Sequence, residues 1–339
     1  MKVLVTGAKG FVGGYIVEKL LENNFHVIGL DNETKYGVLS KSYDKNTNYK
    51  YVNGDAKDIN LLKELLDECD HFIAGAAMIG GISYFHEFAY DLIAENERIT
   101  AAAFDAAIWA FKNKKLKKIT VLSSSMVFES TSIYPTPEGQ ELKSPPPLST
   151  YGFQKLATEY FARGAYEQYK LPYTIIRPFN CVGIGEKRSL SDHDIYSGNI
   201  KLAMSHVVPD LIQKIIKGQY PLRILGDGNQ IRHYTYGEDL AEGIYRSVVS
   251  ENSINEDFNI STDEGMTVMN LAKLIWSKIH PDKEFKVESE KPYIYDVQKR
   301  IPDTRKALKL LNFKAETSIS KSLDIIIPWV KLKIESNEI

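Results

Sequence analysis

Tyr151 and Lys155, four residues apart, are the two residues of this sequence best suited to proton chemistry. The segment around them predicts a helix, and this spacing places both side chains on one helix face. The positive charge of an ammonium favours the phenolate, and so lowers the pKa of a neighbouring phenol. Such pairs also occur on many exposed helices, so the chemistry depends on what the rest of the chain places beside them.

A glycine loop near the start of the chain follows a predicted strand and opens a predicted helix. Gly7 permits the tight turn, Gly10 lets the backbone approach a pyrophosphate, and Gly13 lets the helix pack closely on the sheet. The helix N-terminus supplies free N–H groups and the positive end of a dipole. Together with the serine run at 123–125 and the Tyr–Lys pair, this loop predicts a hydride-transfer enzyme with a tyrosine acid/base.

Two acidic residues follow the next strands of the predicted sheet. Asp31 ends the second strand, where a carboxylate binds the ribose hydroxyls of an adenosine. That carboxylate would repel a 2′-phosphate, so NAD is favoured over NADP, although Lys35 nearby acts in the opposite direction. Asp55, after the third strand, could bind the adenine amino group or be an ordinary turn residue.

The composition excludes several classes of protein. The chain has 339 residues and a formal net charge of −2, which favours neither nucleic acid nor an anionic membrane as partner. No apolar run approaches the ~18 residues of a membrane-spanning helix. The first strand begins at Lys2 and leaves no room for a signal peptide. Cys69 and Cys181 are too few for a disulfide framework, and no zinc-type spacing is present. We therefore expect a cytoplasmic protein with two buried thiols and no metal.

Apolar strands alternate with amphipathic helices over the first ~180 residues. Strands are predicted at 3–6, 27–31, 48–52, 71–74, 118–122 and 173–177, and helices at 13–23, 59–68, 91–112 and 151–169. Further helices are expected at 207–217, 239–250 and 267–279, a strand at 222–225, and two short helices within 302–333. Continuous apolar strands separated by helices indicate a parallel sheet that is covered on both faces. The sequence predicts an α/β protein with a doubly wound, Rossmann-type parallel sheet of seven strands and a smaller C-terminal α/β domain.

Several motifs resemble those of the extended short-chain dehydrogenase/reductase family, in particular its NAD-dependent nucleotide-sugar epimerase and dehydratase branch. They are Thr-Gly-x-x-Gly-Phe-x-Gly at 6–13, Ala-Ala at 76–77, Ser-Ser-Ser-x-Val at 123–127, Tyr-Gly-x-x-Lys at 151–155 and Arg-Pro-x-Asn at 177–180. Two later segments, 226–232 and 296–306, resemble the family's substrate-phosphate and late arginine segments. The resemblance covers nearly the whole chain. It implies an NAD-binding domain of residues 1–179 with about 231–262, and a nucleotide-sugar-binding domain of 180–230 and 263–339.

The resemblance implies roles for three catalytic residues. Tyr151 would take a proton from a sugar hydroxyl while hydride leaves to NAD. Lys155 would lower the pKa of Tyr151 and bind the nicotinamide ribose, and Ser124 would hydrogen-bond to the reacting oxygen. The long loop at 181–205 is expected to order over the substrate.

The resemblance also implies binding residues. Besides Tyr151 and Lys155, the cofactor is assigned to Gly7, Lys9, Gly10, Phe11, Val12, Asp31, Asn32, Asp55, Ala56, Ala76, Ala77, Asn96, Ser123 and Pro178. The nucleotide sugar, linked to UDP, GDP or CDP, is assigned to Ser125, Met126, Gly81, Asn180, Val207, Arg232 and Arg300. Arginine suits the diphosphate because its planar fork binds phosphate bidentately.

The residues after Ser124 select among the reactions of the branch. Dehydratases carry an Asp-Glu pair where this chain has Ser125 and Met126, and neither of these is a carboxylic acid. Epimerases that act at C3 and C5 carry a cysteine where this chain has Met126, which cannot transfer a proton. The remaining reaction is C4 epimerisation through a transient 4-keto sugar.

Three alternatives stay open. The segment 78–82 resembles the double-glycine loop of GDP-sugar 3,5-epimerases and reductases, and Phe128 stands where a tyrosine is usual. A second acid/base would then come from among His86, Glu87, His193 and His206. A nucleotide-sugar dehydratase is a further alternative, and a non-catalytic dinucleotide-binding scaffold is a distant one.

The predicted helices at 91–112 and 151–169 are apolar on more than one side. In the family that the chain resembles, such helices pair across a two-fold axis. We therefore expect a homodimer held by a four-helix bundle.

Overall fold

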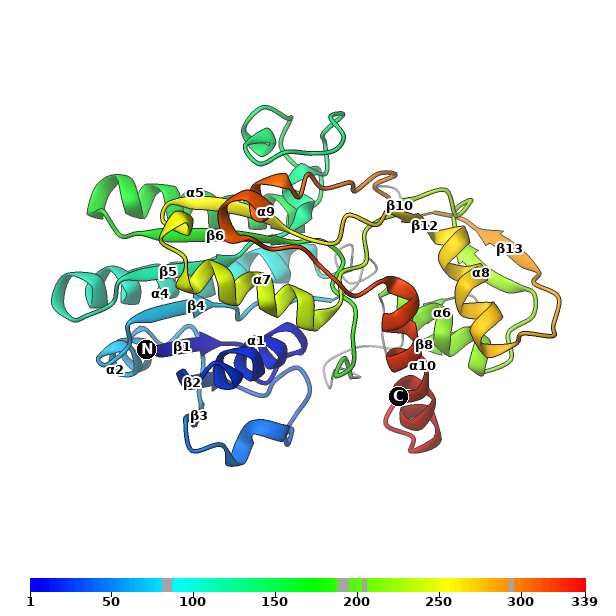
Figure 1. Ribbon diagram of the computed structural model, residues 1–339, viewed down its shortest axis with the longest axis horizontal. Coiled ribbons are helices and arrows are strands. Elements are labelled where there is room, and N and C mark those ends of the chain that lie inside the picture. The colour runs from blue at the N-terminus through cyan, green and yellow to red at the C-terminus, as the bar shows by residue number, and fades with distance from the viewer. Residues whose placement is uncertain (81–86, 188, 190–194, 198, 203–205, 293–295) are drawn as a thin grey trace.

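The computed structural model describes residues 1–80, 87–187, 189, 195–197, 199–202, 206–292 and 296–339. Figure 1 shows a large lobe built on a central sheet, and beside it a smaller lobe that contains the C-terminal helix.

The central sheet has seven parallel strands, as predicted. They are β1 (Lys2–Thr6), β2 (His26–Asp31), β3 (Tyr49–Asn53), β4 (His71–Ala74), β5 (Lys118–Leu122), β6 (Tyr173–Pro178) and β11 (Glu256–Ile260). The strand order is β11-β6-β5-β4-β1-β2-β3, with Thr6 beside Ala74 at the end of the β1–β4 pair. Strands β2 and β3 are therefore added on one side of β1, and β4, β5 and β6 on the other, which makes the position between β1 and β4 the switch point of the sheet. Open α/β sheets bind ligands at such a switch point.

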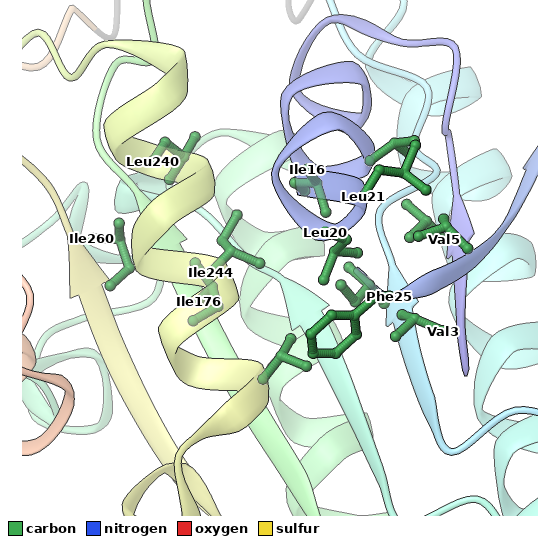
Figure 2. Close-up of a cluster of buried hydrophobic side chains, with 14 of the residues drawn as sticks. Val3, Val5, Ile16, Leu20, Leu21, Phe25, Ile176, Leu240, Ile244 and Ile260 are labelled. Carbon is green, nitrogen blue, oxygen red and sulfur yellow. The ribbon is translucent and has the colours of Figure 1, made fainter. Parts of the chain in front are cut away.

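Helices cover both faces of this sheet. One face carries α1 (Phe11–Glu22), α7 (Gly237–Val249) and α9 (Arg305–Leu311), and the other carries α2 (Ile59–Leu66), α4 (Ala89–Asn113) and α5 (Thr150–Tyr169). Successive residues of a strand point to opposite faces. Val3 and Val5 accordingly contact the α1 side, whereas Leu4 contacts the α4 side. Figure 2 shows Leu20 of α1 and Ile244 of α7 directed toward the sheet. The doubly wound architecture is confirmed.

The smaller lobe has its own apolar core, formed by α6, α8 and α10 around a short sheet. Its elements are α6 (Val207–Ile216), α8 (Val268–Ile279), α10 (Ile319–Glu335), the parallel pair β9 (Leu222–Leu225) and β13 (Val287–Glu290), the antiparallel pair β10 (Ile231–Arg232) and β12 (Met266–Thr267), and the hairpin β7 (Ile195–Ser197) and β8 (Ile200–Leu202). Short 3-10 helices complete the description at η1 (Ser42–Lys45), η2 (Ser125–Phe128), η3 (Gln140–Leu142) and η4 (Glu251–Ser253).

The C-terminal tail differs from the prediction of two short helices. Only α9 is short, and α10 runs for 17 residues through Pro328. Its buried face, with Leu323, Ile326 and Val330, packs in the core of the smaller lobe, and this contact sustains the helix past the proline. Every described helix is too short or too polar to cross a lipid bilayer.

Candidate active site

A cleft of about 1120 Å³ is lined by residues of both lobes. The large lobe contributes the glycine loop, the ends of β2, β4 and β5, and the first turns of α5. The smaller lobe contributes the start of α6 and the end of β9. A cleft of this size at the switch point of a parallel sheet can hold an extended ligand.

The helix α5 places Tyr151 and Lys155 on one face, in the wall of this cleft. Ser149 caps the helix, since its hydroxyl accepts a hydrogen bond of 3.0 Å from the Gly152 N–H. Ser124 hydrogen-bonds to the Tyr151 hydroxyl. The Lys155 ammonium donates to the Leu122 carbonyl oxygen at 2.9 Å and lies 6.0 Å from the centre of the Tyr151 ring. The predicted pair and the predicted serine therefore converge.

The prediction that Lys155 lowers the pKa of Tyr151 is wrong for the protein alone. Burial raises the pKa of Tyr151, against the opposing effects of the Ser124 hydrogen bond and the Arg300 charge. Burial also lowers the pKa of Lys155 to about 8, while the charge of Glu97 opposes this shift. Removal of both groups from water therefore outweighs their proximity.

The glycine loop has the predicted geometry. Gly7 has a φ of +75°, and its carbonyl accepts the Gly10 N–H at 3.0 Å. A side chain at position 13 would collide with the Gly7 carbonyl oxygen, so only glycine lets α1 approach the loop this closely. The loop and the positive end of α1 fit the pyrophosphate of a dinucleotide, which NAD would supply.

Asp31 is held rigidly at the end of β2. Its carboxylate accepts the Lys9 N–H at 3.0 Å and the Glu33 N–H at 2.8 Å. The Lys9 ammonium binds Asp44 at 2.6 Å, and the Lys35 ammonium donates to the Ile79 carbonyl at 3.0 Å. Both cations thus have partners of their own, and the fixed carboxylate fits an adenosine ribose.

Asn96 bonds to the backbone of Met78 in both directions. Its side-chain carbonyl accepts the Met78 N–H at 2.7 Å, and its amide donates to the Met78 carbonyl at 2.9 Å. These contacts fix the segment that follows β4. A cofactor contact of Asn96 stays a prediction.

Two arginines meet on the side of the smaller lobe. Arg232 forms an ion pair of 3.1 Å with Asp296. Arg300 is close to Arg232, and burial together with the Arg232 charge lowers the pKa of Arg300 to about 9. The Nε of Arg300 and the hydroxyl of Tyr234 are buried without hydrogen-bond partners among the described residues. Two guanidinium groups and two unsatisfied donors form a site for an anion.

The cleft brings together most of the predicted site. Among the described residues, those predicted to bind or react all line it except Lys9 and Asn96. Asn96 lines a small adjoining cavity, Lys9 points toward Asp44, and Gly81 lies outside the described residues.

The candidates for a second acid/base separate clearly. His206 lines the cleft, and its Nδ1 lies 2.5 Å from the buried carboxylate of Glu186. Glu87 is exposed and does not line the cleft, while His86 and His193 lie outside the described residues. Phe128 is buried beside Phe179.

The prediction of two buried thiols is correct for one of them. Cys69 is buried, and burial raises the pKa of its thiol to about 12. Cys181 is only half-buried.

Sequence reasoning missed Tyr234, and it named Gln230 and Asp296 only as members of the segments 226–232 and 296–306; all three line the cleft. Gln230 donates to Asp296 at 2.7 Å, and its own oxygen is buried without a partner among the described residues. One signal was present: Gln230, Arg232 and Tyr234 alternate along an extended segment, which places them on one side.

Comparisons with known proteins agree with this geometry. The model of the "NAD dependent epimerase/dehydratase family" matches residues 3–261. A putative UDP-glucose 4-epimerase of Methanocaldococcus jannaschii is 28% identical, over 97% of this chain and 98% of the relative.

Two solved structures superpose on nearly the whole chain. The UDP-glucose 4-epimerase of Thermotoga maritima with UDP-glucose has a TM-score of 0.80 at 27% identity, covering 98% of this chain and 100% of that one. The UDP-glucuronic acid 4-epimerase of Bacillus cereus, in complex with UDP-glucuronic acid and NAD, has a TM-score of 0.81 at 25% identity, covering 98% and 99%. The predicted resemblance is confirmed, and this chain belongs to the NAD-dependent epimerase/dehydratase family.

Proposed function

We propose that this protein is an NAD-dependent nucleotide-sugar epimerase that inverts C4 through a transient 4-keto sugar. The carrying observation is the meeting of Ser124, Tyr151 and Lys155 in one cleft, which the glycine loop and the two arginines also line. The names of the three relatives given above, each a UDP-sugar 4-epimerase by name, support the same reaction.

The side chains would divide the work as follows. When bound by the glycine loop and Asp31, NAD would supply the chemistry of hydride transfer to and from C4. Tyr151 takes the proton of the C4 hydroxyl and gives it back, at a site that is buried from bulk water. Ser124 holds the reacting oxygen, and Lys155 holds the cofactor ribose and stabilises the phenolate. Because proton and hydride both return, no further acid or base is needed.

The two arginines would bind the diphosphate that links the sugar to its base. Arg232 is paired with Asp296, whose charge also acts on the buried Arg300. Asn180 lies beside Arg300, at 3.5 Å between its Oδ1 and the Arg300 Nη1. We propose that the other cofactor and substrate residues predicted from the sequence have the binding roles given there. We also propose the predicted division into an NAD-binding domain and a nucleotide-sugar-binding domain. A cytoplasmic location stays a prediction.

Met126 argues against elimination and against proton exchange at C3 or C5. It lines the cleft directly after the serines, and a thioether can neither donate nor accept the proton that those reactions move.

One observation favours the 3,5-epimerase alternative. His206 lines the cleft with its imidazole bonded to Glu186, as a general acid or base would be. Uptake of solvent deuterium at C3 or C5 of the product would show this second reaction, and C4 inversion without it would exclude it.

Tyr151→Phe tests the proposal. The variant keeps the ring and loses the proton, so we expect C4 inversion to fall at least ~100-fold while NAD stays bound. NMR of a panel of UDP-, GDP- and CDP-sugars measures the inversion, and the absorbance of released NAD measures cofactor content. Unchanged turnover would remove tyrosine from the mechanism. Loss of the 6-hydroxyl in the product would show a dehydratase instead.

A homodimer is the proposed assembly. The helices α4 and α5 pack against each other, and α5 exposes the aromatic side chains of Phe153 and Tyr160 on one face. A second copy of the same helix pair would cover them in a four-helix bundle.

A further inference from the structure

Tyr151 is embedded in an apolar cluster that the proposed chemistry does not use. Its members are the buried Leu92 and Met126 and the partly buried Met78, Ile79, Phe88 and Val297. A tyrosine that only exchanges a proton with a sugar hydroxyl needs polar partners, such as Ser124. The apolar side chains around it therefore call for a separate explanation.

Four members of this cluster line the cleft beside Tyr151: Met78, Ile79, Phe88 and Met126. We refer to these four residues as the apolar wall. Apolar side chains that remain in the wall of a cleft are a typical sign that an apolar part of the ligand covers them.

The apolar wall is fixed in place by hydrogen bonds of its backbone. Asn96 binds the N–H and the carbonyl of Met78, as described above, and Lys35 donates to the carbonyl of Ile79 at 3.0 Å. The Met126 N–H donates to the Ser124 hydroxyl at 3.2 Å. The same serine thus positions the reacting oxygen and one end of the wall, so the wall lies directly beside the atom that reacts.

Two cations lie close to this cluster, but neither belongs to the wall: the Lys35 ammonium donates to the backbone carbonyl of Ile79 at 3.0 Å, and the charge of Arg300 acts on Tyr151. Lys155 donates to Leu122, at the end of β5. Arg232 is paired with Asp296 on the smaller lobe, and Arg300 lies beside Arg232. A carboxylate placed against the apolar wall would lose its hydration without gaining a cation from any of the wall's own residues.

From this juxtaposition we infer that the sugar presents a methyl group to the apolar wall, as a nucleotide-linked 6-deoxyhexose does. The inference rests on the proposed C4 reaction: with the C4 oxygen held by Ser124 and Tyr151, we place the adjacent substituent on C5 against the wall. The Bacillus cereus relative, by contrast, binds UDP-glucuronic acid.

Competing sugars on one nucleotide test this inference. The purified protein with bound NAD is given UDP-6-deoxyglucose, UDP-glucose or UDP-glucuronic acid, and in parallel the GDP-linked forms of the same three sugars. The kcat/KM for C4 inversion is followed by NMR. We expect the 6-deoxy sugar to exceed glucose about tenfold, the usual discrimination by a fitted apolar pocket, and the uronic acid to be the poorest. A uronic acid that equals or exceeds the 6-deoxy sugar would overturn the inference.

Two variants locate the effect. Met126→Thr and Met78→Thr are expected to lower the ratio of 6-deoxy sugar to glucose several-fold and to leave NAD affinity unchanged. Val268→Thr, which changes another apolar residue of the cleft, serves as the control and should leave the ratio unchanged. Weaker NAD binding with an unchanged ratio would assign the wall to the cofactor and overturn the inference. If NAD binds but no sugar is inverted at C4, the proposed function itself fails, and the inference fails with it.

Discussion

Glu159 is the centre of a buried ion network behind Ser124. Its carboxylate accepts the Ser123 hydroxyl at 2.6 Å and two N–H groups of Arg177 at 2.7 Å each. Arg177 also pairs with Glu141 at 2.9 Å and with Asp257 at 2.6 Å. The network therefore ties the residue before Ser124 to the helix that carries Tyr151, and so fixes the positions of Ser124 and Tyr151 relative to each other.

Glu159→Gln should damage both stability and turnover. Removing one charge from a buried pair typically costs about 3 kcal/mol, because the partner charge stays buried. The substitution also replaces the carboxylate that accepts the hydrogen bond of the Ser123 hydroxyl with a neutral amide. We therefore expect kcat to fall while KM changes little. Glu141→Gln is the matched control, since Glu141 binds Arg177 and Arg163 but not Ser123. It should lower the melting temperature and leave kcat nearly intact. Equal kcat in both variants would reduce Glu159 to a purely structural residue.

The lowered pKa of Lys155 predicts an alkaline limit to activity. Burial places this pKa at about 8, so the ammonium is charged below that pH and neutral above it. In the proposed mechanism the charged form stabilises a phenolate at Tyr151, so kcat should fall as the pH rises through about 8. Lys155→Met should be slower by ~100-fold and lack this alkaline limb. A wild-type profile that stays level well above this pH would contradict the assignment.

A segment of the chain after β6 forms a strap between the two sides of the cleft. The Val182 N–H donates to the Thr235 carbonyl at 2.9 Å, and two residues later the Tyr15 hydroxyl accepts the Ile184 N–H at 2.9 Å. The same hydroxyl donates to the Ile184 carbonyl at 3.2 Å. Tyr15 belongs to the cofactor helix α1 and packs edge-on against Phe11 of the glycine loop, at 5.7 Å between ring centres. The strap, residues 180–187, is thus fastened to the element that would hold the pyrophosphate.

Tyr15→Phe should loosen this strap. It removes two hydrogen bonds while keeping the ring between Gly183 and Gly237, where no side chain would fit beside it. At about 1 kcal/mol for each hydrogen bond, NAD should dissociate roughly tenfold faster or more. Stopped-flow protein fluorescence measures the rate. Tyr245→Phe, on α7 and packed against Phe25, is the control and should leave the rate unchanged. An equal rate in both variants would mean that the strap does not retain the cofactor.

The sequence predicted strands well where they are apolar and buried. The bounds of β4 and β5 match those expected, because each is a short apolar run that fits a sheet covered on both faces. The strand β11 was not specified, because it reads Glu-Asp-Phe-Asn-Ile and carries polar groups. Its polar side chains find partners only in the fold: Asp257 pairs with Arg177, and the Asn259 amide donates to the Thr136 carbonyl at 3.0 Å.

The candidate site was predictable to the extent that its residues lie close in sequence. The spacing of Tyr151 and Lys155 and the glycines of the loop act through local geometry, which a pattern can encode. The effect of Arg300 on the pKa of Tyr151, and the raised pKa itself, depend on a fold that joins distant segments and removes both groups from water. A sequence pattern carries no measure of that burial.

At the level of the whole molecule, the outer side of α5 predicts self-association. Phe153 and Tyr160 are two helical turns apart on one face, with 49% and 57% of their surfaces exposed. Leaving two large aromatic side chains in water is costly, and a two-fold partner presents the same face in return. We expect a dimer by light scattering, and a monomer for the double variant Phe153→Glu/Tyr160→Glu, since four added charges would face one another across the axis.

A control variant is needed to distinguish loss of the dimer from loss of the fold. Leu332→Glu places a charge at an equally exposed apolar residue on α10, in the other lobe, and should remain dimeric. Both proteins should keep their melting transitions, because neither change reaches the cores that hold the lobes. A monomeric wild-type protein, or a double variant that still dimerises, would show that these aromatic residues face water or a different partner. In that case α5 would serve the active site alone, and the exposed rings would need another explanation.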